Sequence, residues 1–145
     1  MPVATLNQAA CCSVEGFVRD ALGCACPPAV FEDIRLETGP AGFPEIPGAR
    51  LLAIGGRLLV LLVDGDEVDP GTLQLGKLLR RGRELRDNGG FNRFRLVLVA
   101  PQADSAGTHA AVDPDSGVMG DDRLHLHTIA PAQLPAWLRT PAVAR

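Results

Sequence analysis

The middle of the chain contains two apolar runs that are separated by three residues. Residues 50–54 read RLLAI and residues 58–63 read LLVLLV, and Gly55, Gly56 and Arg57 lie between them. Glycine readily adopts the positive φ angles that a tight hairpin turn requires. The pattern therefore predicts two antiparallel strands, 50–54 and 58–63, joined by a β-hairpin.

An amphipathic segment and another apolar run follow this hairpin. Asp69 and Pro70 form a helix start, and the predicted helix extends to about Asp87. Its buried side is expected to contain Leu75, Leu78, Leu79 and Leu85. Residues 93–100 then predict a strand. We expect strands 58–63 and 95–99 to be parallel neighbours, because a helix between two strands favours a crossover connection.

The N-terminal third predicts two helices and a strand. Residues 14–22 form an amphipathic helix with Ser13 as its cap and Gly23 as its stop. The apolar face of this helix holds Val14, Phe17, Val18, Ala21 and Leu22. A second short helix is predicted from Pro27 and Pro28 to about Ile34, and a strand at 33–37. Residues 1–10 show little pattern and are expected to be loosely held.

The C-terminal third predicts a long polar loop at 101–122, a strand at 123–129 and a short helix at 132–138. A length of 145 residues suits one domain. The whole pattern predicts an α/β (or α+β) fold with a single domain at 1–145. We expect a mixed sheet of about five strands with a β-hairpin, a β-α-β crossover and packed helices.

Composition narrows the class of partner. The chain has a formal net charge of −3, with one Trp, no Tyr and five Phe, so that few aromatic side chains are present for stacking on nucleic-acid bases. Half of its 14 basic residues lie between positions 77 and 95, where the acids are Glu84 and Asp87. This span therefore carries +5 and the remainder −8. The acidic total argues against nucleic acid as the partner.

The cellular compartment is predicted from two absences in the sequence. Residues 1–13 contain no basic segment leading into an apolar stretch, which argues against a secretory signal. The longest aliphatic run, 58–63, is far shorter than the ~20 residues that cross a bilayer. We therefore expect a cytoplasmic protein with no membrane partner. Cysteines in the cytoplasm are more often metal ligands or redox thiols than structural disulfides.

The four cysteines form two pairs, Cys11 with Cys12 and Cys24 with Cys26. A straight helix over 14–22 would separate the pairs by ~13 Å, because each helical residue rises ~1.5 Å. One metal ion with bond lengths of ~2.3 Å cannot join both pairs across that distance. Cys11 and Cys12 are therefore expected to pack as small hydrophobic side chains.

Cys24 and Cys26 lie in a different setting. Gly23 precedes them as a helix stop and Pro27 follows as a helix start, which predicts exposed thiols between two helices. The positive end of a helix dipole would stabilise a thiolate at Cys26. Three alternatives stay open. The pair can bind a soft metal such as zinc, with further ligands needed. It can act as a reversible redox site, or it can pack in a tight helix corner.

The run LGCACPPAVF at residues 22–31, with FNRFRLVL at residues 91–98, resembles a group of small uncharacterised prokaryotic proteins that carry an LGCxCPxxVF signature. This resemblance implies no activity. A cysteine pair at a helix start is also similar to thioredoxin-like proteins, but the chain lacks their CxxC spacing and their preceding β-strand. Neither resemblance therefore assigns a reaction.

Two histidines offer another candidate site. His125 and His127 alternate with leucines, so that both imidazoles share one face of the predicted strand. That geometry can hold a metal ion, with His109 in the long loop as a third ligand. It is also the pattern of a half-exposed strand with its apolar face inward, and we favour this interpretation.

The predicted order of helix, three strands, helix and strand resembles the restriction-endonuclease-like core. Catalysis there needs an acidic residue on the second strand and Glu-x-Lys on the third, to hold Mg²⁺. The third strand here reads RLLVLLV and has no carboxylate and no lysine. The residues therefore exclude the nuclease. No phosphate loop, nucleophile elbow or His-Glu-x-x-His sequence argues for another enzyme.

Arg80, Arg83 and Arg86 form an i, i+3, i+6 row on the predicted helix, which is a candidate strip for partner binding and equally typical of a solvated face.

Two hypotheses about function follow from the sequence. The first is a non-enzymatic protein whose CxC corner binds a soft metal or is reversibly oxidised. The alternative is an interaction module with structural cysteines, whose basic helix contacts an acidic partner or nucleic acid. A protein partner or a homodimer is compatible with both.

Overall fold

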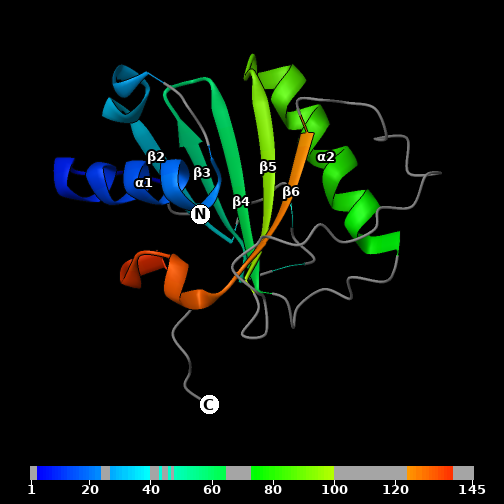
Figure 1. The fold of residues 1–145 in the computed structure, drawn as a ribbon. Helices are drawn as coiled ribbons and strands as arrows, with labels where there is room; N and C mark the ends of the chain where they lie inside the picture. The colour runs from blue at the N-terminus through cyan, green and yellow to red at the C-terminus, as the bar shows by residue number, and fades with distance from the viewer. Residues whose placement is uncertain are drawn as a thin grey trace.

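Six strands of the chain form one mixed sheet in the computed structural model (Figure 1). They are β1 Val3–Thr5, β2 Ile34–Thr38, β3 Arg50–Ile54, β4 Leu58–Asp64, β5 Arg93–Val99 and β6 Leu124–Ile129. Neighbours in the sheet follow the chain order, with antiparallel pairing from β1 to β4 and parallel pairing from β4 to β6. The structure describes residues 3–23, 27–39, 43, 46, 48–64, 73–99 and 124–138.

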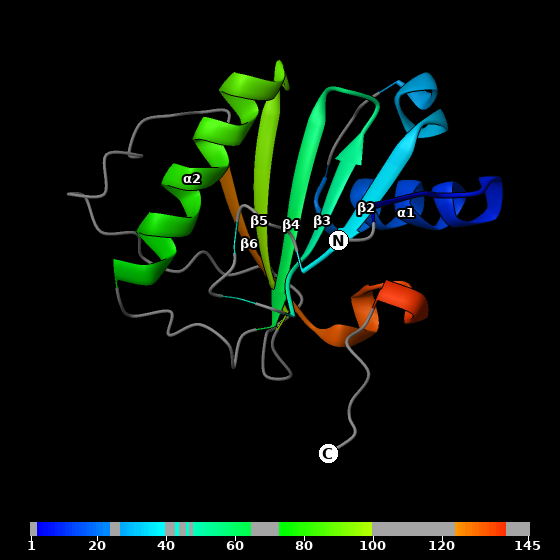
Figure 2. The ribbon, with the colours of Figure 1, turned by 180° about the vertical axis from the view of Figure 1, so that it is seen from behind.

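Helices cover both faces of this sheet. Helix α1, Gln8–Ala21, lies on one face and helix α2, Leu73–Gly89, on the other (Figure 2). Helix α2 lies between β4 and β5 in the chain, and these two strands are parallel neighbours. The predicted crossover is therefore confirmed, as is the α/β fold class with its mixed sheet and hairpin. The described sheet has six strands where about five were predicted.

The central strand β4 shows why the sequence contains an unbroken apolar run. Leu58, Val60 and Leu62 belong to the core beneath α1. Leu59, Leu61 and Val63 belong to the core beneath α2. Because both faces of the strand are covered, alternate side chains are buried in both directions and no polar position is needed.

The turn between β3 and β4 confirms the predicted hairpin. Gly55 and Gly56 have φ angles of 60° and 67°, in the region that favours glycine. A β-carbon at Gly55 would also overlap the backbone oxygen of Val30 in the 3₁₀ helix η1, Pro28–Glu32. The glycine therefore allows both the turn and the close packing of η1 against it.

The N-terminus differs from the prediction. Helix α1 begins at Gln8, where the Asn7 side chain accepts a hydrogen bond from the Ala10 amide at 2.9 Å, and not near Val14. Residues of β1 pair with β2, although residues 1–10 were expected to be loosely held. Each of the two errors has its own physical cause. The strand is stabilised by its distant partner and not by a local pattern, and the first helical turns are rich in small residues.

The C-terminal segment also differs. The helix predicted at 132–138 is observed as two short 3₁₀ helices, η4 Pro131–Gln133 and η5 Ala136–Leu138. Pro135 separates them, because proline lacks an amide donor and disfavours helical geometry in the residue before it. The predicted helix start at 69–70 and the predicted loop at 101–122 lie outside the described residues.

The element order α1, β2, β3, β4, α2, β5 agrees with the order predicted from the sequence. Strands β3 and β4 read RLLAI and LLVLLVD, so that they carry no Glu-x-Lys sequence. The carboxylate at the end of β4, Asp64, forms an ion pair with Arg50. No helix in the described part of the chain is long and apolar enough to cross a membrane.

Candidate functional site

The predicted thiol site, Cys24 with Cys26, lies outside the described residues. Its two flanks are described. Helix α1 is followed by the C-cap Leu22 and by Gly23, which has a φ angle of 70°. Pro27 then caps η1. The chain therefore has the predicted helix stop before the two cysteines and a helix start after them.

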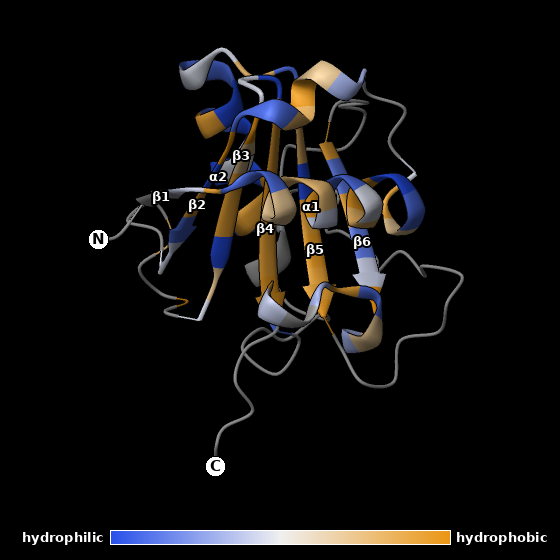
Figure 3. Ribbon diagram, turned by 90° about the vertical axis from the view of Figure 1, so that its left-hand side faces the viewer, coloured by the Kyte–Doolittle hydropathy of each residue, from blue (hydrophilic) through white to orange (hydrophobic). Residues whose placement is uncertain are grey.

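Four basic side chains lie in two pairs on neighbouring strands, and one of them contacts the first of these flanks. Arg93 and Arg95 alternate along β5, and His125 and His127 alternate along β6, which is the parallel neighbour. Arg93 Nη1 lies 3.3 Å from His125 Nε2, and Arg95 Nη1 lies 2.8 Å from His127 Nε2. We call these four residues the basic cluster. They share the face that α1 crosses on its way from β2 toward β6 (Figure 3).

Arg95 connects the basic cluster to α1. Its Nη1 donates a hydrogen bond of 3.2 Å to the carbonyl oxygen of Leu22. This carbonyl lies at the C-terminus of the helix, where the dipole favours a positive charge. Leu22 is two residues before Cys24 in the sequence. The Arg95 guanidinium therefore contacts the chain just before the segment that carries Cys24 and Cys26.

The environment of Arg95 is unusual for a charged side chain. Arg95 is 8% exposed, and its buried Nε has no hydrogen-bond partner. Among the described residues, no carboxylate lies within ion-pair distance of it. Burial lowers the pKa of the Arg95 guanidinium, and the neighbouring charge of Arg93 lowers it further. The cation is thus desolvated without a described counter-ion.

The contacts with the arginines select one tautomer of each imidazole. Because a guanidinium only donates hydrogen bonds, these contacts are hydrogen bonds in the tautomer whose Nε2 accepts and whose ring proton lies on Nδ1. Two arginines therefore face the lone pairs that a metal ion would use. The ring centroids are 6.3 Å apart. The described residues contain no group of three or more potential metal ligands, and His109 is not among them.

The half-exposed strand predicted for the two histidines is confirmed, since both are partly buried and Leu126 is buried. The arginine partners were missed. The sequence contains a signal for them, because RFR and HLH each place two basic side chains on one face of a strand. Combining the two signals requires knowing that β5 and β6 are neighbours.

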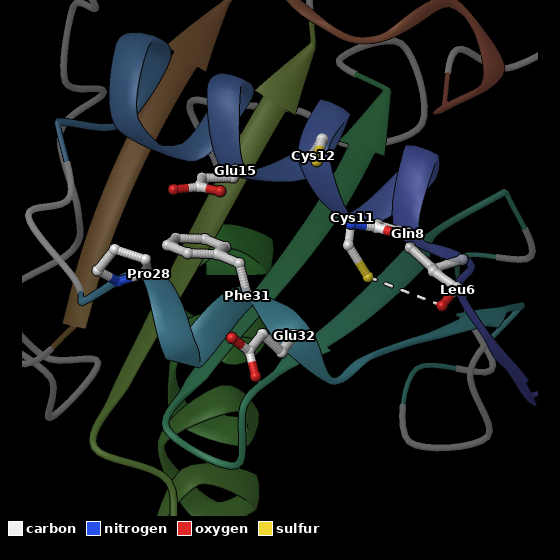
Figure 4. A pocket seen from close by; sticks show the side chains of 8 residues that line it. All are labelled: Leu6, Gln8, Cys11, Cys12, Glu15, Pro28, Phe31 and Glu32. Carbon is white, nitrogen blue, oxygen red and sulfur yellow. Dashed lines mark hydrogen bonds between the residues drawn. The ribbon is translucent and has the colours of Figure 1, made fainter.

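The other cysteine pair lies inside α1, since the helix begins earlier than predicted. Cys11 is buried, and its Sγ donates to the carbonyl oxygen of Leu6 at 3.7 Å (Figure 4). Burial raises the pKa of this thiol. Cys12 is exposed on the helix surface, and both thiols are free. The expectation of buried packing is correct for Cys11 and wrong for Cys12, because successive helical residues point ~100° apart.

A hollow of about 460 Å³ lies between α1 and η1. Its lining consists of Leu6, Gln8, Cys11, Cys12, Glu15, Pro28, Phe31 and Glu32. The carboxylates of Glu15 and Glu32 lie on either side of Phe31 in Figure 4. Negative charge and burial both oppose ionisation of a thiol. Burial raises the pKa of the Cys11 thiol in this hollow, so that Cys11 is not favoured as a reactive thiolate.

The arginine row on α2 does not form one exposed strip. Arg80 is exposed and Arg83 is partly buried, but Arg86 is 3% exposed and lies 2.9 Å from the Asp87 carboxylate. Each step of three residues falls about 60° short of a full helical turn, so that two steps move Arg86 about 120° around the axis. There it lines a polar hollow with Arg57 of the hairpin. Partner binding by the three residues stays a prediction, and the position of Arg86 does not favour it.

Comparisons of the chain with models of protein families, with curated proteins and with solved structures found no match. The resemblance of LGCACPPAVF to small prokaryotic proteins with the same signature therefore stays a prediction.

Proposed function

We propose that this protein is a small, non-enzymatic cytoplasmic protein whose Cys24 and Cys26 form a thiol site. The site either undergoes reversible oxidation or binds a soft metal such as zinc. One observation carries the proposal: the buried guanidinium of Arg95 bonds to Leu22, two residues before Cys24. A nearby cation lowers the pKa of a thiol and increases its thiolate fraction.

Both forms of the proposal require thiolates, since the thiolate is the nucleophile and also the metal ligand. The sequence also predicts a stabilised thiolate at Cys26 from the helix that follows it, but η1 has only five residues and Pro27 and Pro28 have no amide hydrogen to donate, so that this support is small. The setting of Cys11 is the opposite, since burial raises the pKa of its thiol. The two cysteine pairs are therefore proposed to differ in reactivity.

Reversible oxidation is the form that the surroundings favour. Arg95 contacts the flank at Leu22, and positive charge repels a divalent cation while it attracts a pair of thiolates. In the reaction, each thiol loses one proton and the pair loses two electrons as the sulfur–sulfur bond forms. A small-molecule disulfide accepts both electrons and both protons and is released as two thiols.

The experiment compares Cys24→Ser and Cys26→Ser with Cys12→Ser as the matched control. Protein purified without a polyhistidine tag is analysed for bound metal, and its free thiols are counted in the native state after incubation with a small-molecule disulfide. We expect two thiols to be lost and then restored by a reductant. Either serine variant at 24 or 26 should abolish this change, and Cys12→Ser should retain it. Loss of the change in Cys12→Ser alone would show that the wrong pair was chosen.

The alternative function is an interaction module with structural cysteines, whose basic helix contacts an acidic partner or nucleic acid. It has weaker support, because Arg86 is buried and its guanidinium contacts Asp87. Arg80 is the one member of the arginine row that is exposed. A single exposed arginine is a weak basis for recognition of a polyanion.

A further inference from the structure

The basic cluster raises a separate question about charge. Three arginines are buried among the described residues. Arg50 lies 3.3 Å from the Asp64 carboxylate, and Arg86 lies 2.9 Å from the Asp87 carboxylate. Arg95 has no such partner among the residues that the structure describes. A buried charge without a counter-ion is costly, so that a bound anion would stabilise the fold.

The hydrogen bonds of Arg95 leave one edge of its guanidinium available. Both described hydrogen bonds of Arg95 involve Nη1, which contacts the Leu22 carbonyl oxygen and His127 Nε2. Nε is buried without a partner, and no described group accepts from Nη2. The Nε and Nη2 donors form the parallel fork that binds two oxygens of a carboxylate or phosphate. The edge suited to an oxyanion is therefore the edge without a described acceptor, and an oxyanion would approach it from Nη2 because Nε is buried.

The neighbouring side chains support the same ligand. Arg93 lies two residues before Arg95 on the same face and adds a second positive charge. The two histidines accept from the arginines, which fixes the guanidinium orientations. Arg93, His125 and His127 are only partly buried, so that the cluster is open to solvent on one side.

We propose that Arg93 and Arg95 bind a compact oxyanion, such as a phosphate or carboxylate group, with His125 and His127 as positioning residues. The site lies on β5 and β6 and does not depend on the chemistry of Cys24 and Cys26. A phosphate group and a carboxylate group share this chemistry, and the probes below separate them.

The test measures the thermal unfolding midpoint of the full chain in inorganic phosphate, in acetate and in chloride of the same ionic strength. At a phosphate concentration 100 times the dissociation constant, we expect the midpoint to rise by roughly 5–10 °C above that in chloride. Arg95→Met should lose this rise. Arg80→Gln is the matched control, since it removes one exposed positive charge from the other side of the sheet and should keep the rise.

Calorimetric titration with phosphate gives the affinity of each variant. Arg95→Lys keeps the charge but removes the two-donor edge, and we expect it to weaken binding at least about tenfold. Arg93→Gln provides an independent variant if a change at the buried position prevents folding, and it should also weaken binding.

Three results would overturn the proposal. The first is an unfolding midpoint of the wild type that is equal in phosphate, acetate and chloride. The second is a phosphate-induced rise in the midpoint that Arg80→Gln reduces as much as Arg95→Met does. The third is an unchanged phosphate affinity in both Arg93→Gln and Arg95→Lys. Preference for acetate over phosphate would support a carboxylate ligand, and the reverse a phosphate group. Phosphate binding that persists in Cys24→Ser would support the site even if the thiol function fails.

Discussion

Arg50 and Arg95 are both buried on the α1 face of the sheet, yet their charges are balanced in different ways. Arg50 on β3 is level with Leu62 and has the Asp64 carboxylate within 3.3 Å. It also donates to the backbone oxygen of Leu138. Arg95 on β5 is level with Val60 and bonds to a carbonyl and an imidazole, with no carboxylate among the described residues.

The difference separates a structural arginine from a candidate functional one. Arg50 holds the C-terminal 3₁₀ segment against the sheet, and its ion pair compensates much of the cost of burial. Arg95 reaches the C-terminal end of α1 at Leu22, two residues before Cys24 in the sequence, and no described carboxylate pairs with it. A charge that no described carboxylate neutralises is available to a thiolate or to a bound anion.

The largest expected effect is that of Arg50→Met. This change removes the arginine that pairs with Asp64, whose side chain is only 21% exposed. Because a mostly buried carboxylate then loses this ion pair, we expect a loss of about 2–4 kcal/mol in the free energy of unfolding. Arg95→Met, measured by urea unfolding in buffer without oxyanions, should be neutral or stabilising by up to ~2 kcal/mol. If Arg95→Met were as destabilising as Arg50→Met, the two arginines would both be structural and the comparison would fail.

Arg86 tests the comparison with a third buried arginine. Its partner Asp87 is 55% exposed, so that the ion pair is partly screened by solvent. We expect Arg86→Met to lower the free energy of unfolding by about 1–2 kcal/mol, between the results for Arg50→Met and Arg95→Met. The measurement is urea unfolding under the same conditions. A result outside that order would show that carboxylate pairing does not rank these arginines.

Cys11 sharpens the contrast between the two cysteine pairs. Cys11→Ala should cost ~1 kcal/mol through lost packing. Because the folded state raises the pKa of the Cys11 thiol above 9.0, the unfolded thiol ionises first as the pH rises. The stability of the wild type should therefore fall above about pH 9, and part of that fall should be absent in Cys11→Ala. Identical pH profiles of the two proteins between pH 8 and 11 would contradict the raised pKa.

Arg80→Gln should have the smallest effect. The side chain is exposed, so that we expect a change within about 0.5 kcal/mol in the free energy of unfolding. Titration with labelled DNA or RNA at low salt should show no binding by either protein. Binding that weakens steeply as salt rises, and weakens further in Arg80→Gln, would instead favour the alternative function.

The sequence predicts the parts of the fold that have strong local patterns. The hairpin and the parallel pair β4 and β5 follow from apolar runs, from Gly55 and Gly56 and from an amphipathic segment. Strand β1 was missed because three residues paired with β2 carry little pattern of their own. Element type, order and pairing in the central sheet are therefore readable from local signals.

The candidate site is less predictable for a physical reason. Arg93 and Arg95 are visible as alternating charges, and so are His125 and His127. Their contact depends on the parallel pairing of β5 with β6, which are separated by a long stretch of chain. Whether Arg95 has a counter-ion is a property of tertiary packing. The positions of Cys24 and Cys26 are visible in the sequence, but the contact of the buried Arg95 with Leu22 is not.

The most direct test of the link between Arg95 and the thiol site is the rate of alkylation of each cysteine, measured at pH 7 by mass spectrometry. In the wild type, Cys24 and Cys26 should react faster than the exposed Cys12, and Cys11 should react slowest. Arg95→Met should slow Cys24 and Cys26 at least about threefold, since their thiolate fraction falls, and leave Cys12 unchanged. Rates at Cys24 and Cys26 that are unaffected by Arg95→Met, or slower than the rate at Cys12 in the wild type, would contradict the account.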